Sequence, residues 1–139
     1  MTKLLIAISF LLFVGSPFAN AENIYYCASE LSTGFWYNKS NDTWEITSFK
    51  QKRLTLKFRE NYTKLDGVND YMGTWNCHRP HHKFTSWVIC NDRLMIGNIF
   101  SFNIDDYRFL LSTANGSGYN SNAKDPDSES MYGGTCKKF

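Results

Sequence analysis

Apolar and polar residues alternate along several short stretches of this chain. The clearest stretch is 53–59, where Leu54, Leu56 and Phe58 fall on one side and polar or charged residues fall on the other. The same alternation recurs over 100–104. A period of two with one apolar side is typical of a half-buried antiparallel strand.

Further short runs rich in aromatic and β-branched residues predict additional strands. They cover 25–28, 35–37, 44–47, 73–76, 86–89 and 109–111. Clusters of Asn, Asp, Gly and Ser separate them and predict turns, and no convincing helix of ten or more residues is present in 22–139. The polar segment 120–134, which contains Pro126, is expected to form a long loop. The fold class predicted is therefore mainly β, a small antiparallel sandwich or barrel of about seven to nine short strands.

The first residues have the pattern of an export signal. Lys3 precedes a largely apolar run over 4–14, which is followed by Gly15-Ser16-Pro17 and by Ala19-Asn20-Ala21, a small-x-small cleavage site. A spanning helix needs about 20 apolar residues, so this run predicts no stable membrane anchor. We expect a cleaved signal helix at 1–21 and a single domain at 22–139 that acts in the periplasm or outside the cell.

The charge and the aromatic content restrict the function classes. The chain carries 15 basic and 13 acidic residues, a net charge of +2, which argues against nucleic acid as a partner. Aromatic residues make up 17% of the chain, enough to build a core in a short domain. We expect most of Trp36, Tyr37, Trp44, Trp75 and Trp87 to be core residues, although such residues also line sugar or apolar-ligand grooves. Trp36 and Tyr37 are adjacent and would point to opposite faces of a strand, so one of them is a candidate binding contact.

Four cysteines follow the signal, an even number that predicts two disulfides in an exported domain. Three pairings are possible, and we favour Cys77–Cys90 with Cys27–Cys136. A hairpin through 78–85 would bring Cys77 to Cys90, and the second bond would join the first strand to the C-terminus. A zinc site of four thiolates is disfavoured because no C-x-x-C pair is present.

Three histidines lie close together at the predicted turn of this hairpin. His78, His81 and His82 carry imidazoles that suit Zn, Cu or Ni, so the histidine loop is a candidate metal site. The alternative is a solvated loop, because Pro80, Arg79 and Lys83 complicate a closed site and no carboxylate is near in sequence.

The sequence contains no readable catalytic motif. Gly116-Ser117-Gly118 lacks the first glycine of the G-x-S-x-G elbow, since Asn115 stands in its place. We therefore expect no catalytic residue, no enzymatic activity and no cofactor.

Two groups of exported proteins resemble this chain. Tyr25-Tyr26-Cys27, Gly34-Phe35, the stretch 53–58 and the ending 134–139 resemble small exported proteins of unknown function from marine bacteria. Tyr25-Tyr26-Cys27 and Ser117-Gly118-Tyr119 also resemble, more faintly, the C-type periplasmic lysozyme inhibitors. That second resemblance implies a small antiparallel barrel with an inhibitory loop containing Ser117 and Tyr119, although this chain has four cysteines and its Ser-Gly segment comes late.

The sequence favours an exported, non-catalytic binding module for an unknown protein or small ligand. Trp36, Tyr37, Ser117 and Tyr119 are its candidate contacts. A lysozyme-inhibitor-like protein and a metal-binding protein using the histidine loop are the alternatives.

Overall fold

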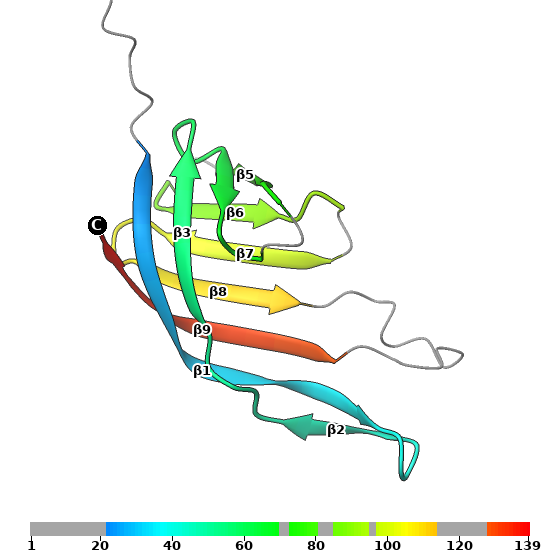
Figure 1. Cartoon of the computed structure of the whole chain (residues 1–139). Helices are drawn as coiled ribbons and strands as arrows, with labels where there is room; N and C mark the ends of the chain where they lie inside the picture. The colour runs from blue at the N-terminus through cyan, green and yellow to red at the C-terminus, as the bar shows by residue number, and fades with distance from the viewer. Residues whose placement is uncertain (1–21, 70–72, 81–84, 95–96, 114–127) are drawn as a thin grey trace, which may run out of the picture.

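The chain forms an all-β structure, a computed structural model in which residues 22–69, 73–80, 85–94, 97–113 and 128–139 are described. Nine strands are present in these residues (Figure 1). They are β1 (Asn23–Asn38), β2 (Thr43–Thr47), β3 (Arg53–Arg59), β4 (Lys64–Asp66), β5 (Trp75–His78), β6 (Trp87–Asn91), β7 (Asn98–Asn103), β8 (Arg108–Thr113) and β9 (Glu129–Lys138). No helix long and apolar enough to cross a membrane occurs in the described part of the chain.

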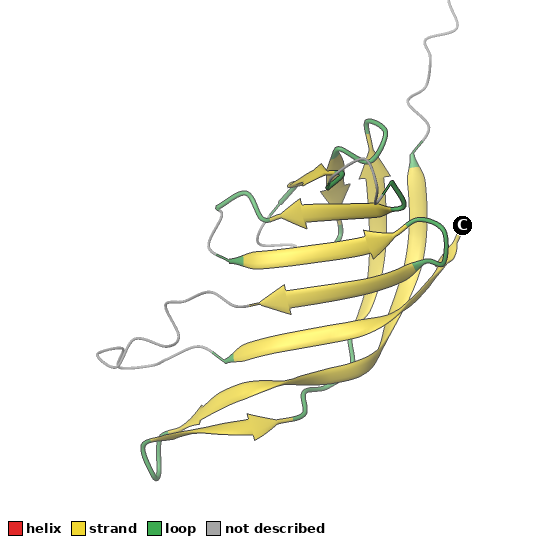
Figure 2. Cartoon of the chain, turned by 180° about the vertical axis from the view of Figure 1, so that it is seen from behind, coloured by secondary structure: helices red, strands yellow, loops and turns green. Residues whose placement is uncertain are grey.

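Eight of the strands close into an antiparallel barrel. The order along the sheet is β1-β3-β4-β5-β6-β7-β8-β9, and pairing of β9 with β1 closes the circle. Of the described strands, β2 pairs only with the second half of β1, so a two-stranded hairpin projects from the barrel (Figure 2). The predicted class, an antiparallel barrel or sandwich of about seven to nine strands, is confirmed as a barrel.

The barrel interior is filled by the apolar side of the alternating strands. Leu56, Phe58, Phe100 and Phe102 are fully buried, as the period-two pattern predicted. Aromatic rings meet at the centre, where Tyr25 contacts Phe102 with ring centroids 4.8 Å apart.

The prediction that most of the tryptophans are core residues is wrong. Of the four, only Trp75 is buried, at 1% exposure, and Trp36 is 43% exposed. Trp44 and Trp87 are half-buried. Phenylalanine and tyrosine fill the interior in their place, because Trp36 and Trp44 lie in the hairpin beyond the barrel.

Both predicted disulfides are confirmed. Cys27 bonds Cys136, and these two residues are direct partners in the β1–β9 pairing. Cys77 bonds Cys90 in the same way across β5 and β6. The first bond spans 109 residues, and in the chain-entropy model such a loop stabilises the fold by about 5 kcal/mol. The bonds are consistent with an oxidising, exported environment.

Two features of the fold differ from the sequence prediction. Residues 25–28 and 35–37, predicted as separate strands, belong to the single strand β1, which continues through a bulge between Ser29 and Leu31. Residues 129–134, expected in a long loop, are in β9. Their polar and glycine-rich sequence lacks the alternation of a strand. The segment is nevertheless a strand because it pairs with β8 along one edge and with β1 along the other.

The two sheet edges that close the barrel approach closely at glycines. A Cβ on Gly134 would lie 2.0 Å from the Ala28 carbonyl oxygen, and one on Gly34 would lie 2.0 Å from the Glu129 carbonyl oxygen. At the neighbouring Gly133 the nearest atom to a Cβ would be 3.7 Å away, an ordinary contact. Close approach of β1 and β9 therefore requires glycine at 34 and 134 but not at 133.

Gly134→Ala should lower the free energy of unfolding by about 1–3 kcal/mol, because the backbone of β1 or β9 must shift to admit the methyl group. Gly133→Ala should change it by less than about 1 kcal/mol. Urea denaturation followed by tryptophan fluorescence measures both. Equal effects of the two substitutions would contradict the requirement for glycine at 134 but not at 133.

Burial of Tyr25 also makes the free energy of unfolding depend on pH in alkaline solution. Burial, the hydrogen bond between the Tyr25 and Tyr62 hydroxyls (2.6 Å) and the nearby Tyr62 and Tyr107 raise the pKa of Tyr25 far above its usual 10. The folded protein therefore keeps a proton that the unfolded chain releases, and the stability that this provides is present below pH 10 and declines above it. Denaturation at a series of pH values should show this decline in wild type and in Tyr26→Phe, and a shallower decline in Tyr25→Phe. A variant Tyr25→Phe with the full wild-type slope would exclude this origin.

Candidate functional site

The projecting hairpin presents aromatic side chains on both of its faces. Residues 34–38 of β1 pair with 43–47 of β2, and the connecting turn includes Asp42 at a φ of 58°. Tyr37 and Trp44 lie opposite each other, with ring centroids 5.5 Å apart. Trp36 lies on the other face, opposite Glu45. The structure thus places both Trp36 and Tyr37 outside the buried core, whereas the sequence predicted that one of the two would lie outside it.

Polar contacts hold the end of the hairpin. Asn38 and Asn41 each donate an Nδ2 hydrogen bond to Glu45 Oε1 at 2.9 Å. Hydrogen bonds from Asn41, then Asn38, and a weaker one from Trp36 hold the pKa of the Glu45 carboxyl below its usual value, and burial opposes them. These bonds hold the Glu45 carboxylate at the hairpin end, and the strand register places Trp36 opposite Glu45.

Exposed apolar side chains collect on the outside of the sheet where β7, β8, β9, β1 and β2 lie side by side. The strand register aligns them in rows with polar residues. Ser112 lies between Ile99 and Met131 in one row, and Phe35 lies between Glu129 and Ile46 in another. We call this surface the apolar outer face. Its members are between 41% and 78% exposed, and they are Leu31, Phe35, Ile46, Ile99, Leu110 and Met131.

A hollow of about 310 Å³ opens within this face. Phe35, Ile46 and Met131 contribute apolar side chains to its lining, and its polar lining residues are Thr33, Ser112, Ser130 and Glu129. Gly34 also lines it and adds no side chain. An apolar hollow with a few polar groups at its margin is suited to hold an apolar group of a ligand.

A bulge in β1 turns Leu31 and Phe35 outward. Ser29 pairs with Gly134 and Leu31 pairs with Gly133, so β1 has one extra residue, Glu30, at this point. Before the bulge the odd-numbered Tyr25, Cys27 and Ser29 are buried. After it the odd-numbered Leu31 and Phe35 face solvent. Phe35, Ile46 and Met131 were not among the contacts predicted from the sequence. Phe35 and Ile46 lay in predicted strands of three and four residues, too short to show which side is buried, and Met131 lay in the expected loop 120–134.

The other predicted site residues are not brought together by the described structure. His78 is exposed at the end of β5, whereas His81 and His82 lie outside the described residues. Among the described residues no group of three or more His, Cys, Asp or Glu side chains is placed to hold a metal ion. Ser117 and Tyr119 also lie outside the described residues. The histidine-loop metal site and the inhibitory loop therefore stay predictions.

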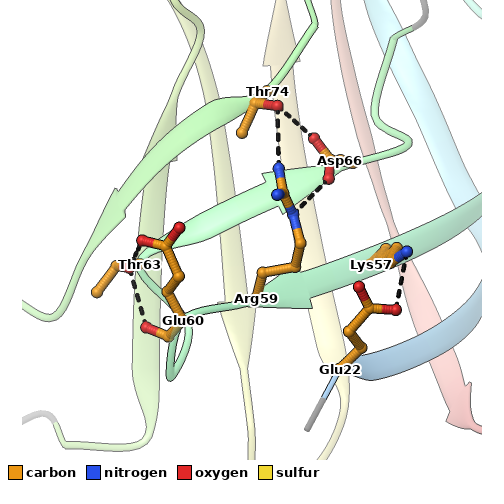
Figure 3. Close-up of polar contacts among 7 residues, drawn as sticks. All are labelled: Glu22, Lys57, Arg59, Glu60, Thr63, Asp66 and Thr74. Carbon is orange, nitrogen blue, oxygen red and sulfur yellow. Dashed lines mark hydrogen bonds and ion pairs between the residues drawn. The ribbon is translucent and has the colours of Figure 1, made fainter. Parts of the chain in front are cut away.

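A group of charged and polar residues on β3, β4 and the segment before β5 is paired within itself. Arg59 Nε lies 2.9 Å from Asp66 Oδ2, and Thr74 Oγ1 donates to Asp66 Oδ1 at 2.6 Å while accepting from Arg59 Nη2 at 3.2 Å (Figure 3). This closed set joins β3, β4 and the segment before β5. A hollow of about 320 Å³ beside it is lined by Arg59 and Lys64, among others. Lys64 Nζ donates to Asn76 Oδ1 at 2.7 Å, so these cations are already engaged.

No family model matches this chain, and neither a curated protein nor a solved structure does.

Proposed function

We propose that this chain is an exported, non-catalytic binding module that holds an extended protein segment along the projecting hairpin and the apolar outer face. Residues 1–21 would direct its export, and the two disulfides suit that destination. The observation that carries the proposal is the apolar outer face itself. Contiguous exposed apolar side chains on a small domain are typical of an interaction site.

The free edge of β2 favours an extended segment as the occupant. Among the described strands β2 pairs with β1 alone, so its outer backbone groups are available for another strand. A segment added there would gain backbone hydrogen bonds and would place alternate side chains beside Ile46 and the hollow. The hollow, lined by Phe35, Ile46 and Met131, would receive one apolar side chain.

Panning a random peptide library against the purified protein tests this site. Enriched peptides should alternate apolar and polar residues, and Phe35→Ser/Ile46→Ser should weaken their binding at least about tenfold, because two apolar contacts are lost. Leu94→Ser, at a side chain that is 65% exposed outside this face, is the matched control and should bind like wild type.

Two results would overturn the proposal. One is a panning experiment without enrichment above background, or with peptides that bind both variants equally. The other is a wild-type dimer in sedimentation velocity that Phe35→Ser/Ile46→Ser abolishes, because a second copy would then be the occupant of the face.

A lysozyme-inhibitor-like function is the second candidate. The closed antiparallel barrel agrees with the fold that the resemblance implies, and Tyr25 and Cys27 are buried in its first strand. Fold alone does not establish a function, so this agreement supports the candidate only at the level of architecture.

Lysis of bacterial cell walls by a C-type lysozyme, followed by turbidity, tests the second candidate. An inhibitor should slow the lysis in proportion to the protein added, and Ser117→Ala/Tyr119→Ala should relieve the inhibition. Unchanged lysis at a large excess of the protein would eliminate this function while leaving the peptide-binding proposal intact.

A further inference from the structure

A second hollow, of about 420 Å³, lies on the outside of the barrel where β9, β1 and β3 run side by side. It is separate from the hollow at Phe35, since the two share no lining residue. Its exposed lining residues are Tyr26, Ala28, Arg53, Thr55, Thr135 and Lys137. Nothing in the peptide-binding proposal uses it.

The register of the three strands explains why the surface is hollowed there. Thr135, Ala28 and Arg53 form one row across β9, β1 and β3. Ala28 lies between two larger side chains. Because its side chain is a single methyl group, the surface is depressed at the middle of the row. Side chains directly opposite each other on neighbouring strands have Cβ atoms about 4.5–5.5 Å apart, so both neighbours flank the depression.

The next row on the same face places a second cation and an aromatic ring at the hollow. It consists of Lys137, Tyr26 and Thr55. Arg53 and Lys137 therefore occupy diagonal corners of a six-residue grid, and their long side chains can both reach over Ala28. Tyr26 is 51% exposed and contacts the Phe139 ring edge-on, with centroids 5.8 Å apart.

The two cations are not neutralised by a neighbouring carboxylate. Within the described residues neither Arg53 nor Lys137 forms an ion pair or a side-chain hydrogen bond. Lys57, on the same side of β3, is paired to Glu22 at 2.8 Å (Figure 3). Arg53 and Lys137 thus keep their donors available.

One acidic group borders the hollow and limits which ligands fit. Glu30 Oε1 accepts a hydrogen bond from Thr135 Oγ1 at 2.7 Å. The Thr135 hydroxyl therefore donates to Glu30, and the hydroxyls of Thr55 and Tyr26 are left to donate to a ligand. The hollow has two positive charges against one negative charge, so it favours a single anionic group.

We propose that this hollow binds the phosphate or sulfate ester of a small ring compound such as a sugar. Arg53 and Lys137 would hold the ester oxygens from two sides, because a guanidinium and an ammonium both donate charge-assisted hydrogen bonds to such groups. The hydroxyl of Thr55 would donate a further bond. The ring of the ligand would lie over Ala28 against Tyr26, which supplies an exposed aromatic surface.

Titration of the purified protein with glucose 6-phosphate, glucose 6-sulfate and glucose at low ionic strength, followed by amide NMR, tests this site. Both esters should shift the amide signals of Tyr26, Ala28 and Thr55 in a saturable way, and glucose should not. Binding of one ester and not the other would identify the source of the anionic group within the proposed class.

Two variants separate the site from general electrostatic attraction. Arg53→Gln/Lys137→Gln should weaken ester binding at least about tenfold, since the charge-assisted hydrogen bonds from both cations to the ester oxygens are lost. Lys50→Gln/Arg93→Gln removes the same net charge at exposed positions that do not line this hollow and should leave binding within about twofold of wild type. Ala28→Met keeps every charge, fills the depression and should also abolish the shifts.

The proposal fails if wild type shows no saturable shift with either ester, or if both double variants lose binding equally. It also fails if Ala28→Met binds as wild type does. Dispersed amide spectra of each variant confirm that the barrel is folded in these comparisons. Because these residues and Phe35 or Ile46 belong to different hollows, failure here leaves the peptide-binding proposal standing, and the reverse also holds.

Discussion

Pairing of β1 with β9 is the interaction on which the rest of the structure depends. It joins the two ends of the described chain over Tyr25–Phe35, and without it the eight-stranded sheet would remain open along two edges. The Cys27–Cys136 disulfide fixes this pairing covalently at a directly opposed pair. Glycine at 34 and 134 lets the two backbones come close enough to pair. The buried aromatic cluster around Tyr25 is enclosed only because the circle is complete.

The bulge at Glu30 gives one strand two roles. Up to Ser29, β1 contributes interior side chains and pairs with β3 and β9 as part of the barrel wall. Beyond Leu31 it turns its odd-numbered side chains outward and exchanges β3 for β2 as its neighbour. The hairpin thereby presents Phe35 and Ile46 on an exposed surface that is not part of the barrel core. Both proposed sites lie on the outside of the same strand, the ester site before the bulge and the apolar one after it.

Much of the barrel could be predicted from sequence because its strands alternate regularly. Leu54, Leu56 and Phe58 are buried as predicted, and the disulfide pairing followed from placing Cys77 and Cys90 at the ends of two strands. β9 could not be found in this way, since Gly133 and Gly134 lack the side chains that a strand pattern needs. The apolar outer face escaped for a different reason: Phe35 and Ile46 lay in predicted strands too short to show which side is buried, and Met131 lay in the expected loop 120–134. The ester hollow depends on three strands in register, information that becomes available only once their pairing is known.

Closure of β1 on β9 completes the barrel and leaves the outer edge of β2 without a partner among the described strands. Amide hydrogen exchange of the isolated protein, resolved by residue, tests it most directly. We expect slow exchange for the paired amides of Tyr25–Ala28 and Thr135–Lys137, and fast exchange for those amides of Thr43–Thr47 that point away from β1. Uniform strong protection across β2, equal to that of β9, would contradict the account, because it would mean that the hairpin edge is already covered in solution.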